Sequence, residues 1–410
     1  MNKKNCIVAQ SGGPTAAINA SLAGVIQGVL ASEEYDTIYG ALNGIFGILK
    51  EHMLNLSERS REIPHFIEIL KTSPAMYLGS CRYKLPDYKE DDEPYRQIFK
   101  LFEKLNIQAF FYIGGNDSMD TVMKLGHYGK RIGSSISIIG IPKTIDNDLC
   151  VTDHTPGYGS AAKFVASSLL EIAHDTFIYA VKSVTIVEIM GRDAGWLTAA
   201  AALARNDYSA APHLIYLPEV AFSKEAFIED VRTLLATRNN VIVAVSEGIR
   251  DEHGEYISST TAAADTFGHS QLSGTGKALE YMIKDALGVK VRSIELNVLQ
   301  RCASHTASLT DLNESFALGQ KAVEGAERGE TMCMLTMRRT SQHPYCVTTH
   351  FSPVDDIANQ AKSIPREWIN EAGNDITQEL VDYMLPLIQG EPDLKYKDGL
   401  PVYLPVDHLL

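Results

Sequence analysis

One lysine and two aspartates follow directly on an apolar run in the first half of the chain. The stretch IPKTIDND extends from Ile141 to Asp148 and contains Lys143, Asp146 and Asp148. Two carboxylates this close can divide the work of group transfer, because one can accept a hydroxyl proton while the other orients the hydroxyl or reaches a metal ion. The stretch therefore predicts catalytic chemistry at the end of a buried strand.

Two glycine-containing turns follow other apolar runs. SGGPT contains Gly13, and GGNDS contains Asn116 and Asp117. Paired glycines at a strand-to-helix turn let backbone N–H groups approach an anion, and the helix N-terminus adds a partial positive charge. The side-chain oxygens of Asn116 and Asp117 suit Mg²⁺ beside a phosphate. A tight turn and ordinary helix capping are the alternative interpretations.

Two further polar stretches follow apolar runs in the middle of the chain. MGR contains Gly191 and Arg192, and SEG contains Glu247. An arginine beside a glycine that leaves room suits a sugar phosphate, and a strand-end carboxylate suits sugar hydroxyl groups. Taken singly, a surface arginine and a solvated acid are the alternatives. Taken together, the stretches predict a phosphoryl-transfer site with a sugar pocket.

The periodicity of the sequence indicates the elements that must position these residues. Apolar runs predict strands at residues 5–10, 38–42, 108–114, 136–142, 183–190, 213–218, 240–248 and 291–299. Amphipathic segments predict helices at residues 15–32, 95–106, 118–129, 160–177, 193–204, 224–237 and 276–288. Continuous apolar strands that alternate with helices indicate parallel sheets covered on both faces, so we expect an α/β fold of two doubly wound domains. Such sheets bind ligands at the carboxyl ends of their strands.

Composition and charge exclude several classes of protein. The 410 residues are 45% hydrophobic and 21% charged, and 37 basic against 51 acidic side chains give a formal net charge of -14. Nucleic-acid-binding proteins usually carry a positive field, so we expect no nucleic-acid partner. The sequence has no apolar run of membrane-spanning length and no signal-peptide pattern, so we expect no membrane partner. The six cysteines are scattered without a CxxC pair, which is typical of free thiols in the cytoplasm.

Two stretches partly match nucleotide-binding motifs. PGYGSAA, from Pro156 to Ala162, contains GxGxxA but follows a polar loop rather than a strand. LSGTGKA, around Lys277, lacks the first glycine of a P-loop, because Gln271 stands there, and Ala278 replaces the metal-binding Ser or Thr. Both stretches therefore predict ordinary turns that lead into helices.

The motifs together, in their order and spacing, resemble the phosphofructokinase family, and more narrowly its pyrophosphate-dependent branch of bacterial type. They are GGPT, GGNDS, PKTIDND, PGYGS, MGR, SEG and VLQR, within residues 6–328. The resemblance implies two Rossmann-like domains with mostly parallel sheets and an active site in the cleft between them. It also implies Mg²⁺ as cofactor, with fructose 6-phosphate, pyrophosphate, fructose 1,6-bisphosphate and phosphate as substrates and products.

The resemblance implies a role for each matched residue in the sugar site. Asp146 would take the proton from the acceptor hydroxyl. Asp148 would lie beside it, and Thr144 would hold the transferring phosphate. Arg292 and Arg301 fall where the family binds the 6-phosphate of the sugar. The remaining sugar-site residues implied are Met190, Gly191, Arg192 and Glu247.

On the donor side, the resemblance implies that the amide of Gly13 meets the phosphoryl donor and that Arg82 lies near it. ATP-dependent relatives have GGDGS and PGTIDND, whereas Asp117 and Lys143 replace two of those glycines here. Asp117 would place bulk and negative charge where a nucleotide α-phosphate must lie, and Lys143 would neutralise the phosphate that leaves pyrophosphate. We therefore expect reversible, Mg²⁺-dependent phosphoryl transfer from pyrophosphate to fructose 6-phosphate. An ATP-dependent 6-phosphofructokinase and a catalytically silent regulatory subunit are the alternatives.

Three positions depart from the family pattern. Asn116 replaces the commoner aspartate at the metal contact, which makes that contact neutral. Val298 stands where relatives have His or Tyr on the sugar, and Ser183, next to Lys182, replaces a basic residue that reaches the neighbouring subunit's substrate. The last two changes bear on which sugar phosphate is preferred. Because the family shares residues across subunits, we expect a homodimer or homotetramer.

The order of motifs and elements predicts the domain organisation. We expect residues 1–150, with about 302–350, to form a phosphoryl-donor domain. Residues 151–301 should form a sugar-phosphate domain, and residues 351–410 a C-terminal extension. Residues 57–66 and 82–95 are polar and interrupted by proline, so we expect loops or insertions there.

Overall fold

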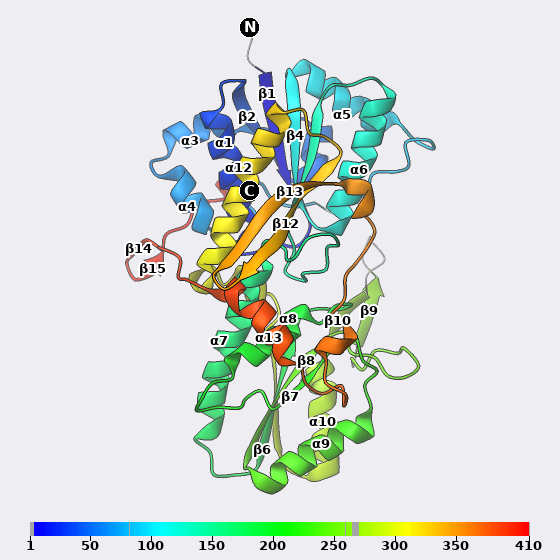
Figure 1. Cartoon of the computed structure of the whole chain (residues 1–410), viewed down its shortest axis with the longest axis vertical. Helices are drawn as coiled ribbons and strands as arrows, with labels where there is room; N and C mark the ends of the chain where they lie inside the picture. Colours follow the sequence, from blue (N-terminus) through cyan, green and yellow to red (C-terminus); the bar gives the residue numbers. More distant parts are fainter. Residues whose placement is uncertain (1–3, 82, 259, 265–269, 410) are drawn as a thin grey trace.

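Two mainly parallel β-sheets, arranged one above the other along the long axis, organise the chain (Figure 1). The computed structural model describes residues 4–81, 83–258, 260–264 and 270–409. Within these residues, the upper sheet has seven strands in the order β13-β12-β5-β4-β1-β2-β3, and the lower sheet has four in the order β11-β6-β8-β7. Neighbouring strands are parallel in both sheets, except for the edge pairs β2–β3 and β12–β13. The predicted α/β fold with two mostly parallel sheets is confirmed.

The strands of the upper sheet are β1 (Lys4–Gln10), β2 (Tyr35–Ala41), β3 (Met53–Asn55), β4 (Ile107–Gly114), β5 (Ser137–Pro142), β12 (Cys333–Gln342) and β13 (Tyr345–Pro353). The strands of the lower sheet are β6 (Ser183–Ile189), β7 (Leu214–Tyr216), β8 (Asn240–Ser246) and β11 (Lys290–Glu295). Two short hairpins stand apart from these sheets, formed by β9 (Thr260–Ala264) with β10 (Ser270–Ser273) and by β14 (Tyr396–Lys397) with β15 (Leu400–Pro401).

Helices cover both faces of each sheet. On the upper sheet, α1 (Ile18–Ala31) and α12 (Leu309–Glu327) cover one face, and α5 (Glu93–Lys104) and α6 (Asn116–Arg131) cover the other. On the lower sheet, α7 (Tyr158–Phe177) and α8 (Trp196–Ala199) lie opposite α9 (Lys224–Thr237) and α10 (Thr275–Leu287). The shorter helices are α2 (Gly44–Leu49), α3 (Leu56–Glu62), α4 (Phe66–Thr72), α11 (Leu299–Cys302) and α13 (Gln378–Met384).

Strand β1 shows why the central strands are apolar throughout. Successive side chains of a strand point to opposite faces of its sheet. Cys6 and Val8 therefore join the core cluster under α1 and α12, whereas Ile7 and Ala9 join the cluster under α5 and α6. Both faces are buried, so no polar alternation is possible along the strand.

Two glycines allow α1 and α12 to pack closely. A Cβ atom added at Gly24 would lie 2.0 Å from the carbonyl oxygen of Phe316, and one added at Gly319 would lie 2.2 Å from that of Ser21. Backbone meets backbone at these contacts, so any larger residue would force the helices apart. This pair brings residues 309–327 back onto the N-terminal sheet.

Several sequence-based expectations about elements were wrong. Residues 57–66 contain most of α3 and the start of α4 instead of a loop, and the side chain of Asn55 caps α3 by accepting a hydrogen bond from the N–H of Glu58. The strand expected at 291–299 ends at Glu295, and α11 begins at Leu299. Helix α12 and the hairpin of β12 and β13 were not predicted.

The C-terminal helix α13 lies at the junction of the two sheets (Figure 1).

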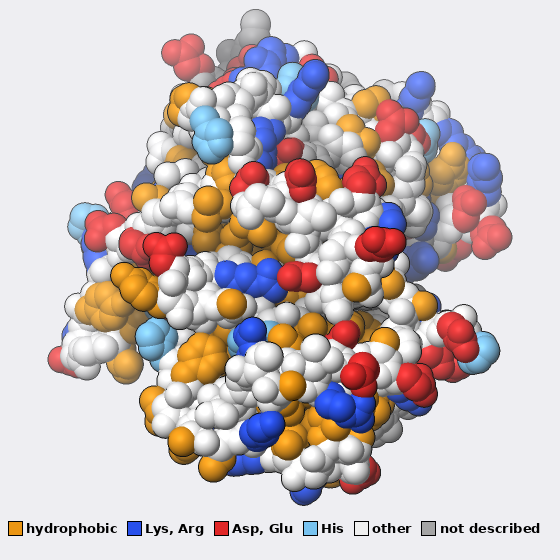
Figure 2. Space-filling model, turned by 60° about the horizontal axis from the view of Figure 1, so that its bottom comes forward, with side chains coloured by type: hydrophobic (Ala, Val, Ile, Leu, Met, Phe, Trp, Pro, Cys, Tyr) orange, Lys and Arg blue, Asp and Glu red, His pale blue; other side chains and the backbone are white. Residues whose placement is uncertain are grey.

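The surface shows mixed charge. On the face in Figure 2, Lys and Arg side chains are scattered among Asp and Glu. Among the described residues, no helix is long and apolar enough to cross a membrane.

Candidate active site

The carboxyl ends of β1, β4 and β5 bring the predicted donor residues together. These strands are adjacent in the order β5-β4-β1, so the turns that follow them share one edge of the sheet. Gly13 follows β1, Asp117 follows β4 and Lys143 follows β5. The N–H of Lys143 donates to the carbonyl oxygen of Gly114, 2.9 Å away, which joins the second and third turns.

Lys143 is buried, and its ammonium group crosses to the first turn. Its Nζ donates a hydrogen bond to the carbonyl oxygen of Gly13 at 2.7 Å. Burial, with a smaller contribution from the charge of Arg301, lowers the pKa of Lys143 to about 8, although Asp146 and Asp148 oppose the shift. The amine therefore stays cationic at neutral pH, beside the glycine turn and the two carboxylates.

The TIDND loop holds its two aspartates in a strained turn. The Oγ1 of Thr144 accepts a hydrogen bond from the N–H of Asp146 at 3.1 Å and donates to its carboxylate at 3.4 Å. Asn147, between the aspartates, is fully buried and has a left-handed φ of 54°. Asparagine tolerates that conformation better than most residues. The turn thereby places Asp146 and Asp148 close together.

Both carboxyl groups have raised pKa values. For Asp146 the main cause is burial, which Lys143, the Thr144 hydroxyl and Arg192 counteract. For Asp148 the causes are burial and the nearby charge of Asp146. A raised pKa makes a carboxylate a better proton acceptor, and mutual repulsion between two such groups favours a cation between or beside them.

The GGNDS turn separates the roles expected of Asn116 and Asp117. The side chain of Asp117 is exposed in the first turn of α6. The side-chain oxygen of Asn116 accepts a hydrogen bond from the N–H of Asn359 at 2.6 Å, and its Nδ2 donates to the carbonyl oxygen of Gln360 at 2.8 Å. The Asn116 amide is therefore bound to the C-terminal extension, and coordination of a metal would have to use its remaining lone pair.

The lower sheet presents the predicted sugar residues at the carboxyl ends of β6 and β8. The N–H of Gly191 donates to Glu247 at 3.4 Å, and the carbonyl oxygen of Gly191 accepts from the hydroxyl of Ser246 at 2.5 Å. A Cβ atom at Gly248 would lie 1.8 Å from the carbonyl oxygen of Arg192, so only glycine fits there. The Nε of Arg192 is buried without a hydrogen-bond partner among the described residues, which leaves a donor for a ligand.

Electrostatic effects link the two sheets across the junction. Burial raises the pKa of Glu247 to about 7, the N–H of Gly191 opposes the shift, and the charge of Asp146 adds to it. Arg192 in turn favours the charged form of Asp146. Asp146 of the TIDND loop is therefore close enough to Arg192 and Glu247 for their charges to interact.

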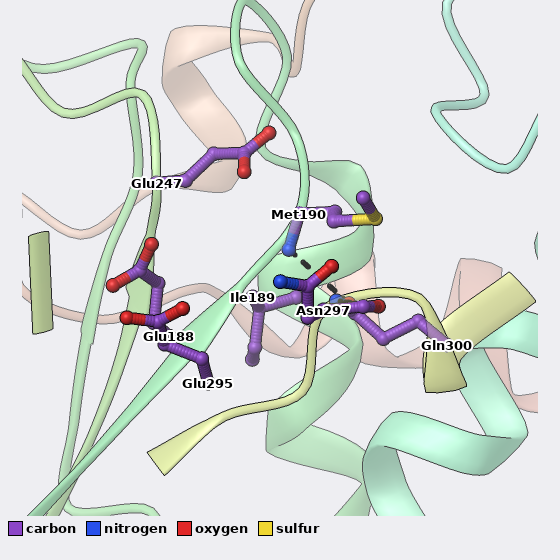
Figure 3. A pocket seen from close by; sticks show the side chains of 7 residues that line it. All are labelled: Glu188, Ile189, Met190, Glu247, Glu295, Asn297 and Gln300. Carbon is purple, nitrogen blue, oxygen red and sulfur yellow. Dashed lines mark hydrogen bonds between the residues drawn. The ribbon is translucent and has the colours of Figure 1, made fainter. Parts of the chain in front are cut away.

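Glu247 is one of seven residues that line a small pocket (Figure 3). Its lining residues are Glu188, Ile189, Met190, Glu247, Glu295, Asn297 and Gln300. The N–H of Met190 donates to the side-chain oxygen of Gln300 at 3.2 Å, which fixes the MGR turn to the start of α11. Acidic and amide side chains of this kind suit hydroxyl groups better than phosphate.

Arg301 and Arg292, the other predicted arginines that the structure describes, lie in different places. A Cβ atom at Gly13 would be 3.4 Å from Nη1 of Arg301, so Arg301 reaches the donor turn. Arg292 pairs along β11 with Thr185, five residues before Met190, and its guanidinium lies 3.5 Å from Asp175. That register puts Arg292 roughly 16 Å along the strand from the MGR turn. Within one chain, Arg292 is therefore too far away to join the site residues around Asp146. Arg82 lies outside the described residues.

The PGYGSAA and LSGTGKA stretches begin helices α7 and α10. A carboxylate of the protein binds the N-terminus of each helix. Asp311 accepts hydrogen bonds from the N–H groups of Gly157 and Ser160, at 2.9 Å each, at the start of α7. Glu188 accepts one from the N–H of Gly276 at 2.7 Å at the start of α10. Protein carboxylates hold the positions that a phosphate would need.

Some residues that contact the site carried no usable signal in the sequence. Gln300 is part of the VLQR motif and Asn147 is part of TIDND, but neither motif predicts which residue the side chain contacts. Lys362 and Tyr383 come from the C-terminal extension, where no motif was found. Their contacts with the TIDND loop depend on how the extension packs.

Comparison with known proteins agrees with this geometry. Residues 5–326 match the family described as Phosphofructokinase. Pyrophosphate–fructose 6-phosphate 1-phosphotransferase from Halomonas elongata is 40% identical over 98% of this chain and 96% of its own length. Crystal structures of pyrophosphate-dependent phosphofructokinases from Nitrosospira multiformis and Marinobacter aquaeolei both superpose with TM-scores of 0.87. Their sequences are 36% and 38% identical to this chain, covering 98% of it and 96% and 95% of theirs. The chain belongs to the phosphofructokinase family.

Proposed function

We propose that this protein transfers a phosphoryl group from pyrophosphate to the 1-hydroxyl of fructose 6-phosphate, reversibly and with Mg²⁺, giving fructose 1,6-bisphosphate and phosphate. The observation that carries the choice of donor is the buried ammonium of Lys143, held 2.7 Å from the carbonyl oxygen of Gly13. A fixed cation at this turn suits a small, highly charged leaving group. The named activities of the relatives from Halomonas elongata and Nitrosospira multiformis support the same donor.

The donor set of the site fits Mg²⁺. Among the described residues, no cluster of three or more His, Cys, Asp or Glu side chains could hold a metal by itself. That agrees with Mg²⁺, which usually takes one or two protein carboxylates together with substrate phosphates and water. Asp117, Asp146 and Asp148 offer such carboxylates, and Asn116 stays a further predicted contact. When bound, the ion would neutralise charge on the transferring phosphate.

Residues of the chain supply the remaining functions. Asp146, with its raised pKa, accepts the proton of the 1-hydroxyl, and Asp148 lies beside it. Thr144 and Gly13 contact the phosphates of the donor, and Lys143 stabilises the leaving phosphate.

The sugar is held from the lower sheet. Arg192 binds its phosphate through the Nε that has no partner in the described part of the chain, and Glu247 accepts hydrogen bonds from the sugar's hydroxyl groups. Met190 and Gly191 form the wall of that site, and Arg301 reaches from α11 toward the donor turn.

The assignment of domains and subunits forms part of the same proposal. Residues 1–150 with about 302–350 act as the phosphoryl-donor domain, residues 151–301 act as the sugar-phosphate domain, and residues 351–410 extend over both. Arg292, which does not reach the Asp146 cluster of its own chain, would serve in a homodimer or homotetramer, and Arg82 would serve on the donor side. A cytoplasmic location fits the free cysteines.

Steady-state assays test the donor directly. The purified protein is assayed with fructose 6-phosphate and Mg²⁺, with either pyrophosphate or ATP as donor. We expect turnover with pyrophosphate, much weaker turnover with ATP, and loss of both on chelation of Mg²⁺. Preference for ATP would replace the proposal with an ATP-dependent kinase, and the absence of turnover with both donors would indicate a silent regulatory subunit.

A further inference from the structure

The hydroxyl of Tyr383, in α13, lies behind the TIDND loop. It accepts a hydrogen bond from Nδ2 of Asn147 at 2.9 Å and donates one to the carbonyl oxygen of Asp153 at 2.7 Å. Asn147 is fully buried in its left-handed conformation between Asp146 and Asp148. Its other side-chain atom, Oδ1, accepts a hydrogen bond from the N–H of Thr155 at 3.0 Å. Tyr383 therefore binds one of the two polar side-chain atoms of Asn147, the residue whose positive φ shapes the turn.

A second residue of the extension holds the same loop by its backbone. The N–H of Lys362 donates to the carbonyl oxygen of Asp148 at 2.7 Å. Its Nζ donates to the carbonyl oxygens of Thr152 and Asp153 at 2.9 and 2.6 Å. The segment after the catalytic aspartates is thus attached at several points to residues more than 200 positions later in the chain.

Tyr383 and Lys362 also contact Trp196 of helix α8, which follows the MGR turn. Trp196 begins α8, four residues after Arg192, and its Nε1 donates to the carbonyl oxygen of Lys362 at 3.1 Å. The rings of Trp196 and Tyr383 have centroids 5.5 Å apart, and the ring of Trp368 packs against both. The extension therefore connects the catalytic loop of the upper sheet with the sugar turn of the lower sheet.

We propose that Tyr383 and Lys362 are positioning residues, which keep Asp146 and Asp148 in register with the Met190–Arg192 turn during phosphoryl transfer. A base must lie within hydrogen-bond reach of its proton, and misplacement by about 1 Å can cost 100-fold in rate. A loop with a non-glycine residue at positive φ persists only when its surroundings hold it. This proposal deepens the phosphotransferase assignment and rests on it for its kinetic consequences.

Tyr383→Phe tests the proposal, because it removes the hydroxyl and keeps the ring against Trp196 and Trp368. We expect kcat to fall about 10-fold or more in both directions, with KM for fructose 6-phosphate and for pyrophosphate within about twofold of wild type. Tyr95→Phe is the matched control, since Tyr95 is buried and its hydroxyl bonds to the carbonyl oxygen of Pro86 at 2.6 Å, in the packing of α5. The control should leave kcat within about twofold, although its melting temperature falls.

A double-mutant cycle tests whether Tyr383 acts through Asn147. Asn147→Gly keeps the positive φ but removes the amide that Tyr383 binds. If the hydroxyl acts through that amide, Tyr383→Phe should lower kcat much less in the Asn147→Gly background than in wild type. Equal effects in both backgrounds, or an effect of Tyr383→Phe no larger than that of Tyr95→Phe, would overturn the proposal.

Hydrogen exchange separates this proposal from the assignment of function. Peptides covering residues 143–155 should exchange faster in Tyr383→Phe and in Lys362→Met than in wild type, and at the wild-type rate in Tyr95→Phe. Unchanged exchange in both extension variants would refute positioning even if the wild-type enzyme is active. Faster exchange in a protein that turns over neither donor would instead support positioning and refute the phosphotransferase.

Discussion

The ammonium of Lys143, at the end of β5, donates a hydrogen bond to the carbonyl oxygen of Gly13, at the end of β1, over 2.7 Å. Strand β4 lies between these two strands, so the contact joins the turns at both ends of the row of three strands that carry the predicted donor residues. A Cβ atom at Gly12 would lie 3.0 Å from the same Nζ, so the glycine turn and the lysine occupy adjoining space. The cation is therefore held by the protein before any donor binds, which is the preorganisation that charge stabilisation requires.

Replacement of Lys143 and Asp117 should change the preferred donor. Lys143→Gly should lower kcat with pyrophosphate by about 10²–10³-fold, because a fixed cation aimed at developing charge is lost. Asp117→Gly should allow weak ATP binding, because exposed bulk and negative charge leave the N-terminus of α6. The double variant should shift the ATP-to-pyrophosphate ratio of kcat/KM by more than the product of the single shifts. Steady-state kinetics of the four proteins with both donors measure this, and full pyrophosphate turnover in Lys143→Gly would contradict it.

Asp146→Asn should abolish turnover in both directions while fructose 6-phosphate still binds. The carboxylate acts as base in the forward direction and, once protonated, as acid in the reverse direction, and an amide can do neither. Loss of a positioned general base typically costs about 10²–10⁴-fold. Calorimetric titration with fructose 6-phosphate provides the binding control. Turnover within tenfold of wild type would remove Asp146 from the proton transfer.

Arg192→Ala should weaken binding of the sugar phosphate and leave the donor unaffected. Among the residues that the structure describes, the buried Nε of Arg192 has no hydrogen-bond partner, so it is available for a charge-assisted hydrogen bond. Such a bond contributes roughly 1.5–3 kcal/mol. KM for fructose 6-phosphate should therefore rise about 10-fold to 100-fold, while KM for pyrophosphate stays within about twofold. The opposite pattern would assign Arg192 to the donor side.

His154 should make folding stability depend on pH above neutrality. Its ring nitrogens lie 2.8 Å from Asp153 and 2.7 Å from Glu314, and these carboxylates outweigh burial to raise the pKa of His154 from 6.5 to about 9. Because the folded pKa is the higher one, the stabilisation is fully present below pH 6.5 and is lost as pH rises through about 9. A difference of this size corresponds to a free energy of unfolding on the order of 3 kcal/mol.

Urea unfolding of wild type and His154→Gln, from pH 6 to pH 10, measures that loss. The stability difference between the two proteins should be largest at pH 6 and should shrink as His154 deprotonates. Arg339 also binds Asp153, at 3.0 Å, so the variant keeps one cation beside that carboxylate. A difference that does not change with pH would show that His154 is uncharged when the protein is folded.

The types and order of the residues along the chain were enough to predict which side chains lie at the ends of the central strands. Lys143 and Asp146 follow a continuous apolar run, and Gly13 and Asp117 follow two others, so local pattern sufficed to place them at one edge of a parallel sheet. The same pattern failed at residues 57–66, because α3 and α4 have seven residues each and are too short to show a clear helical period.

The contacts between these residues depend on the packing of the folded chain. It placed Arg301 next to Gly13, brought Asp146 close enough to Glu247 for its charge to raise the pKa of that carboxyl group, and left Arg292 beside Asp175. It also attached Tyr383 to Asn147, 236 positions earlier in the chain. Such contacts arise from how helices and the C-terminal extension pack on two separate sheets, and no periodicity within a short window encodes that packing.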